Sequence, residues 1–92
     1  MTIEHPDGGR FEGYGKPKMT PRHPKYAAAV VIRENGSDRL IRFGLQGADR
    51  FPKREGESKA DAQKRDAWKK RHAANIKRGR TSGAYWANRF LW

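Results

Sequence analysis

The chain has 92 residues, of which 21 are Lys or Arg, ten are Asp or Glu and none is Cys, so its formal net charge is +11. A chain of this length buries only about 60–65% of the surface that its unfolded form exposes, which excludes a large enzyme core. The absence of cysteine excludes disulfides, thiolate metal sites and cysteine nucleophiles. Because compact cationic proteins attract polyanions, nucleic acid is the first partner that the composition suggests.

The hydropathy of the chain also indicates whether a segment could span a membrane or direct secretion. Its longest apolar run, residues 26–32, is far shorter than the roughly 18 residues that a membrane span requires. The run also lies too far from the N-terminus to be part of a signal peptide. We therefore expect no membrane association, and a soluble protein of the cell interior or of a particle assembled there.

The positive charge is concentrated in one part of the chain. Residues 53–80 hold eleven basic and four acidic side chains, a net charge of +7. The other segments carry +2 (residues 1–25), +1 (26–52) and +1 (81–92). The cationic character is therefore local, which directs the search for a polyanion-binding surface to residues 53–80.

Residues 1–25 predict an extended arm. They contain four of the five prolines of the chain and four of its ten glycines. Proline lacks a backbone donor and glycine is costly to order, so we expect no regular structure before Lys25. Phe11 and Tyr14 have two alternative roles: they anchor the arm in the domain, which we favour, or they stack on a nucleic-acid base.

Residues 26–45 predict a β-hairpin. Residues 26–34 are rich in β-branched side chains, and apolar and basic residues alternate over 39–45. Between them, Asn35-Gly36 is a typical two-residue hairpin turn. One face of this hairpin is expected to contribute to the core through Val31, Leu40 or Ile41, and Phe43, with the register left open. The other face carries arginines that are either solvated, as is common, or in contact with phosphates: Arg33, Arg39 and Arg42.

A long helix is predicted from Ser58 to Arg78, after a connecting loop over residues 44–56. Ser58 can cap the first amides, and Asp61 stands at the capping-box position three residues later. Gly79 is placed as a C-terminal stop. Acidic residues near the start and basic residues near the end also agree with the helix dipole.

The faces of this helix differ in character. Trp68, His72 and Ile76 recur every four residues, with Asn75 beside them, and form a stripe that we expect to pack on the hairpin. The remaining surface is basic or alanine. Like charges on neighbouring turns destabilise a helix, so a helix this basic is better tolerated when phosphates neutralise it. A basic face that is merely solvated is the alternative.

The last segment, residues 81–92, predicts a short aromatic helix that Thr81 or Ser82 can cap. By helical spacing, the residues that share a face are Tyr85 with Arg89, and Trp86 with Phe90.

The aromatic residues of this last helix divide into two groups. Burying Trp86 and Phe90 would contribute several kcal/mol at roughly 25 cal/mol per Å² of apolar area, so we expect both in the core. Tyr85 and the terminal Trp92 are candidates to contact a partner, because exposed aromatic side chains make good anchors in interfaces.

Four motifs follow one another in the second half of the chain: FGLQG at 43–47, PKREGES at 52–58, KKRHAANIKRG at 69–79 and SGAYWANRFLW at 82–92. This layout of a glycine loop, a charged helix, an Arg-His pair and S-x-AYWA with a terminal Trp resembles small basic proteins encoded by tailed bacteriophages and large DNA viruses. The resemblance covers about residues 40–92 and leaves out the arm. It implies a viral context, in a virion or in the host cytoplasm, and no particular mechanism.

Motifs for catalysis are weak in this chain. His72 and Asn75 lie about one helical turn apart and suggest a nuclease base with its orienting residue. However, a metal-dependent nuclease needs clustered ligands, and here the acidic residues stand singly among lysines. Residues 13–18 do not form a phosphate-binding loop, because they are proline-containing and lack the flanking strand and helix. We therefore predict that the protein is not an enzyme and has no catalytic residue, metal or cofactor.

Two functions remain. In the first, the protein binds nucleic acid, DNA rather than RNA, largely without sequence preference. The expected phosphate contacts are Lys64, Arg65, Lys69, Lys70, Arg71, Lys77, Arg78 and Arg80. In the second, it is a minor structural protein of a virion, and its arm and the aromatic residues Tyr85 and Trp92 contact capsid or tail subunits. A small inhibitor of a host enzyme is a third option that has no sequence signature.

For the fold, the patterns predict a small α+β protein. It is expected to consist of a flexible extended arm over residues 1–25 and a single domain over 26–92. The domain would contain the hairpin, the long basic helix and the short aromatic helix. An isolated hairpin is marginal, so the helices or a second copy of the chain must cover its apolar face, which makes a homo-oligomer an option.

Overall fold

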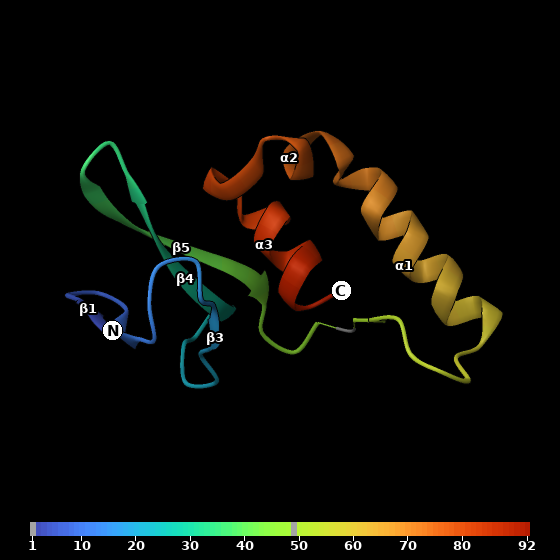
Figure 1. Ribbon diagram of the computed structural model, residues 1–92. Helices are drawn as coiled ribbons and strands as arrows, with labels where there is room; N and C mark the ends of the chain where they lie inside the picture. The colour runs from blue at the N-terminus through green and yellow to red at the C-terminus, as the bar shows by residue number, and fades with distance from the viewer. Residues whose placement is uncertain (1, 49) are drawn as a thin grey trace. The chain divides into compact units, whose positions relative to one another are not determined.

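The computed structural model of the protein describes residues 2–48 and 50–92 (Figure 1). Its elements are, in chain order, β1 (Ile3–His5), β2 (Gly9–Phe11), β3 (Lys18–Met19), β4 (Tyr26–Glu34), β5 (Ser37–Leu45), α1 (Lys59–Arg71), α2 (Ala73–Lys77), the 3-10 helix η1 (Gly79–Thr81) and α3 (Gly83–Phe90). Strands precede helices, and the expected α+β class is confirmed. The chain forms two compact units, residues 1–47 and 48–92, so the boundary lies after Gly47 and not after Lys25.

The hairpin of the first unit has the predicted turn. β4 and β5 are antiparallel, and Glu34 pairs with Ser37 across the turn. Asn35 and Gly36 both have positive φ, 51° and 80°. Two consecutive left-handed residues are the requirement of a type I′ turn, whose twist matches that of the flanking strands, and Asn-Gly meets it at low cost.

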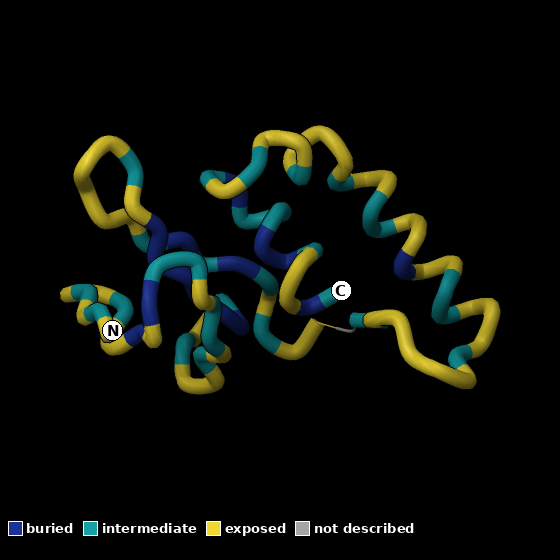
Figure 2. Tube along the Cα trace, in the orientation of Figure 1, coloured by how far each residue is buried: buried dark blue, intermediate teal, exposed yellow. Residues whose placement is uncertain are grey.

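The pairing register of the two strands, which the sequence left open, places buried apolar residues on both faces of the hairpin. Val31 pairs with Leu40, and Val30 pairs with Ile41. Since paired residues point to the same side of a sheet, Val31 and Leu40 share one face, while Ile41 belongs to the other with Phe43. Residues 27–32 of β4 are all buried, as the dark blue of this strand in Figure 2 shows. β4 is the central strand of the order β3-β4-β5, and it has no solvated face.

The N-terminal segment is folded, and the expectation of no regular structure before Lys25 is wrong. β1 pairs with β2 in a two-stranded sheet, and β3 pairs with β4. The prolines lie in the turns between these short strands, where a missing donor costs no ladder bond. Phe11 is only 2% exposed and belongs to the core cluster of Ala29 and Val31, so its anchoring role is confirmed. A Cβ on Gly8 would stand 2.8 Å from a methyl carbon of Leu40, so glycine permits this close approach.

The predicted long helix of the second unit begins as expected but is interrupted. The Ser58 hydroxyl accepts a hydrogen bond from the backbone N–H of Asp61 at 3.1 Å, which confirms the cap. α1 ends at Arg71, and His72 leaves helical geometry with φ −102° and ψ 8°. Neither proline nor glycine marks this break in the sequence. The helix resumes as α2, and Gly79, with φ 80°, follows the residue that closes it.

The C-terminal helix holds two residues that were expected in the core, Trp86 and Phe90, and the expectation is confirmed for the first of them. Ser82 precedes α3 as its N-cap residue, although its side chain makes no capping bond. Trp86 is 5% exposed, and Ala87 and Leu91 are also buried. Phe90 is 40% exposed, so its expected core role is wrong. Leu91, whose N–H donates to the carbonyl of Ala87 at 2.9 Å, lies one helical turn after Ala87 and is buried in place of Phe90.

The helices of the described residues, which lie within residues 50–92, are all too short or too polar to cross a membrane.

The core role of the N-terminal segment can be tested at Phe11. We expect Phe11→Ala to destabilise the protein by about 3–5 kcal/mol, because a fully buried aromatic side chain is lost and leaves a cavity. Urea unfolding followed by circular dichroism measures the change. Met19→Ala is the control, since Met19 is 51% exposed in β3, and its effect should stay within about 0.5 kcal/mol. A Phe11→Ala effect as small as that of the control would contradict the core role.

Candidate nucleic-acid interface

Two ion pairs fix the loop that precedes α1 onto the helix. Arg65 donates from Nη1 and Nη2 to the two carboxylate oxygens of Glu57, at 2.6 and 2.9 Å, and from Nη1 to the carbonyl of Phe51 at 3.3 Å. Arg54 pairs with Asp61 at 2.6 Å. The Arg65 residue is only 9% exposed. Arg65 is thus engaged inside the protein, and its guanidinium is not placed for the phosphate contact that the sequence suggested.

The pair formed by Arg65 and Glu57 also shifts the acidity of both groups. The hydrogen bonds from Arg65 hold the pKa of the Glu57 carboxyl below its ordinary value of 4.5. The same hydrogen bonds, which Glu57 accepts from Arg65, raise the pKa of the Arg65 guanidinium. Hydrogen bonds to the charged form of a group favour that form, so both members of the pair are ionised at neutral pH.

The other basic residues near the end of α1 and in the turns after it are not compensated. We call residues 69–80 the basic segment. Its basic side chains are exposed except that of Lys69, which is partly buried: Lys69, Lys70, Arg71, Lys77, Arg78 and Arg80. No acidic residue follows Asp66 in the sequence. Within residues 2–48 and 50–92, the ion pairs all involve residues up to Arg65 and none in the basic segment.

The helix dipole accounts for only part of this arrangement. Basic side chains in the last turn of a helix are favoured by the partial negative charge there, which suits Lys69, Lys70 and Arg71 at the end of α1. A favourable dipole does not require that acidic residues be absent from the next two turns. Among the described residues, the dipole is thus the only compensation that the basic side chains at the end of α1 receive, since none of them forms an ion pair.

The hairpin arginines of the first unit behave differently. Each of them hydrogen-bonds within its own unit, in the pairs Arg33 with the Tyr14 hydroxyl (3.1 Å), Arg39 with Glu34 (3.1 Å) and Arg42 with the carbonyl of Asp7 (2.7 Å). The Tyr14 hydroxyl in turn donates to Asp38 at 2.7 Å. Arg33 and Arg42 thus hold the N-terminal segment against the hairpin, while Arg39 joins the two strands of the hairpin.

An aromatic column lies beside the basic segment, formed by His72, Trp68 and Trp92. The ring centroids of Trp68 and His72 are 4.5 Å apart, and those of Trp68 and Trp92 are 4.7 Å apart with planes inclined by 14°. Phe51 approaches Trp92 at 6.2 Å, and Lys64 Nζ lies 4.8 Å from the centroid of Phe51. The predicted stripe of α1 is thus confirmed for Trp68 and His72, while its packing on the hairpin stays a prediction. No periodic pattern in the sequence marks Phe51.

The second aromatic residue predicted to contact a partner, Tyr85, lies on α3. Its hydroxyl accepts a hydrogen bond from Arg89 Nη1 at 3.2 Å, which confirms that the two share a face. Its ring meets that of Trp86 edge-on at a centroid distance of 5.2 Å. Tyr85 is therefore partly used in packing α3.

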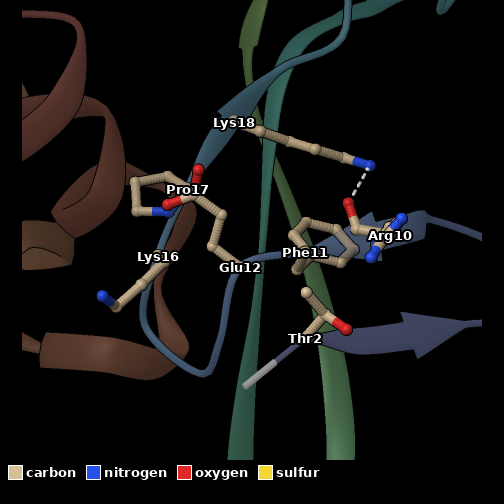
Figure 3. Close-up of a pocket in the computed structure, with 7 residues that line it drawn as sticks. All are labelled: Thr2, Arg10, Phe11, Glu12, Lys16, Pro17 and Lys18. Carbon is tan, nitrogen blue, oxygen red and sulfur yellow. Dashed lines mark hydrogen bonds between the residues drawn. The ribbon is translucent and has the colours of Figure 1, made fainter.

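A small depression in the first unit is the other candidate site. It has a volume of about 330 Å³ and is lined by Thr2, Arg10, Phe11, Glu12, Lys16, Pro17 and Lys18 (Figure 3). Lys18 Nζ donates to the carbonyl of Arg10 at 2.7 Å, so this charge is already bound. Figure 3 shows the charged ends of Arg10 and Lys16 on opposite sides, and Glu12 adds a negative charge. The depression therefore lacks converging groups for an anion.

Metal ligands do not cluster in the described part of the chain, where no group of three or more His, Asp or Glu residues is close enough to hold an ion. His5 and His23 instead accept hydrogen bonds from nearby backbone N–H groups. No family model, curated protein or solved structure matches this chain. The viral resemblance thus stays a prediction.

The role of the Glu57 ion pair can be tested through pH. Because the folded pKa of Glu57 is lowered, its stabilising contribution is complete above the unfolded value of 4.5 and is lost as the pH falls through the folded value. We expect Glu57→Gln to lower the urea midpoint at pH 7, and the difference from the unmodified protein to shrink as the pH falls below 4.5.

The control for this test is Glu55→Gln, which removes the same charge from the same loop. Glu55 is exposed and forms no ion pair with any described residue. A Glu57→Gln effect that equals that of Glu55→Gln, or that persists unchanged at pH 3, would show that the ion pair does not stabilise the loop on α1.

Proposed function

We propose that the protein binds nucleic acid through its phosphate backbone, largely without sequence preference. The observation that carries this proposal is the basic segment, which holds six basic side chains and no acidic one over residues 69–80. The proposed contacts are the basic segment and one further exposed lysine of α1, namely Lys64, Lys69, Lys70, Arg71, Lys77, Arg78 and Arg80. Arg65 is left out of this set because Glu57 binds it on both nitrogens.

The charge balance of residues 53–80 supports a polyanion as the partner. The two ion pairs use two of the eleven basic and two of the four acidic residues, so nine basic and two acidic residues remain. The net charge of these residues is still +7, and it is carried by side chains that form no ion pair with any described residue. Phosphates would neutralise this charge and release condensed counterions, which is the main driving force of non-specific binding.

The geometry of α1 favours backbone contacts over base reading. Successive residues of a helix point about 100° apart, so Lys69, Lys70 and Arg71 project to three different sides. Such a spread of flexible cations suits contact with several phosphates and does not suit insertion of one helix face into a groove. The motif layout, which resembles proteins of DNA viruses, favours DNA over RNA.

The alternative of a virion structural protein loses one of its arguments. It depended on a free N-terminal arm and on the aromatic residues Tyr85 and Trp92 as contacts for capsid or tail subunits. Phe11 is buried in the first unit, so the N-terminal segment is not a free arm. The viral setting itself remains a proposal that depends on the motif layout.

Charge reversal in the basic segment tests the proposal. We expect the variant with Lys69→Glu, Lys70→Glu and Arg71→Glu to bind duplex DNA more weakly and with a flatter salt dependence. Each lost phosphate contact reduces the slope of log affinity against log salt by about 0.9, so the expected reduction is about 2–3. Fluorescence anisotropy of labelled duplexes of unrelated sequence, measured over a range of salt concentrations, gives the slope.

A matched control reverses three exposed basic residues of the first unit, Arg10, Lys16 and Arg22. It changes the net charge of the protein by the same amount, so it separates a local interface from a general charge effect. Affinity and slope that fall equally in both variants, or in neither, would contradict the proposed interface.

A further inference from the structure

The aromatic column points to a more specific ligand than nucleic acid in general. Building on the proposed function, we propose that the protein prefers single-stranded nucleic acid and that a base of the strand stacks on Trp92, at the end of the column. The phosphates on either side of that base would lie against the exposed cations of α1.

The geometry of the column leaves Trp92 as a stacking surface. Trp68 contacts both other rings of the column, with centroid distances of 4.5 Å to His72 and 4.7 Å to Trp92. The Trp68 and Trp92 planes are nearly parallel, with an angle of 14°. Phe51 meets Trp92 at an angle of 52° and so does not cover it as a parallel ring would. Trp92 is only partly buried, and a flat base can extend the stack.

Cations flank this column on α1. Lys64 precedes Trp68 by four residues and Arg71 follows it by three, so both lie on the same side of the helix as Trp68. Both side chains are exposed, and Lys64 Nζ is near the Phe51 ring, at 4.8 Å. A stacking aromatic ring between positive charges is the arrangement by which proteins bind single strands without reading their sequence.

The tryptophans of the aromatic column are more exposed than Trp86, which is a core residue. Trp86 is 5% exposed, and its indole N–H donates to the carbonyl of Arg80 at 2.8 Å, so its ring and its polar atom are both used in folding. Trp68 and Trp92 are partly exposed. In a duplex the bases already stack on one another, and they would have to unstack before they could reach Trp92. A single strand offers its bases without this cost.

The test compares single-stranded and double-stranded probes at the same salt concentration. The probes are a thymidine oligonucleotide and a uridine oligonucleotide of about 20 nucleotides each, and a DNA duplex of the same length. We expect tighter binding of the single strands, with quenching of tryptophan emission that the duplex does not cause. Equal affinity for the thymidine and uridine strands identifies single-strandedness as the determinant, whereas binding of one strand alone adds a preference for its sugar or base.

Substitution of Trp92 then separates stacking from charge. We expect Trp92→Leu to weaken single-strand binding about tenfold or more and to leave duplex affinity unchanged, while Trp92→Phe retains most of the single-strand affinity. Phe90→Leu removes a neighbouring exposed aromatic side chain and should change neither affinity. If Trp92→Leu does not fold, the tryptophan quenching of the unmodified protein decides the question.

The outcomes distinguish this inference from the function on which it rests. Equal affinity for single strand and duplex, with no quenching, overturns the preference for single strands and leaves nucleic-acid binding intact. A Trp92→Leu variant that loses affinity for both ligands equally overturns the stacking site. If neither ligand binds at low salt, the proposed function fails, and this inference fails with it.

Discussion

The bidentate ion pair between Arg65 and Glu57 organises the second unit. It joins the middle of α1 to the loop before the helix, and a further bond from Arg65 to the carbonyl of Phe51 extends that attachment along the loop. Phe51 in turn meets Trp92, which stacks on Trp68. The loop, the helix and the C-terminus are thus connected through one partly buried charge pair. Because removing one member of such a pair leaves the other charge without a partner, the arrangement depends on both.

The same pair determines which charges are left for a ligand. In the first unit, arginines hold the N-terminal segment against the hairpin, as the bond of Arg42 to the carbonyl of Asp7 illustrates. In the second unit, Arg65 and Arg54 take up the acidic groups at the start of α1, and no acidic residue follows Asp66. Charge in ion pairs therefore serves folding, whereas the six basic side chains of the basic segment, which form no ion pair with a described residue, follow the middle of α1. This separation is the physical basis of the proposed interface.

Aromatic residues serve two purposes in the second unit. Trp86 is buried and fully bonded, and it stabilises α3 together with η1 through the carbonyl of Arg80. Trp68 and Trp92 form a partly exposed stack beside uncompensated cations. A small unit with little apolar surface would gain stability from burying these rings further. The two rings are instead partly exposed and lie next to positive charge. We therefore propose that they bind a ligand that has both flat faces and phosphates.

The sequence by itself determined the features that depend on neighbours along the chain. These are the Asn35-Gly36 turn, which needs two left-handed residues, the cap at Ser58, and the concentration of charge in residues 53–80. Only the tertiary structure decided the features that depend on distant partners. In the sequence, nothing distinguishes Arg65 from the other basic residues of α1. Only its hydrogen bonds to Glu57 in the structure exclude it from the proposed interface. Likewise, the proline-rich N-terminal segment is folded because Phe11 packs against Ala29 and Val31 of β4, and burial against a strand distant in sequence leaves no local pattern.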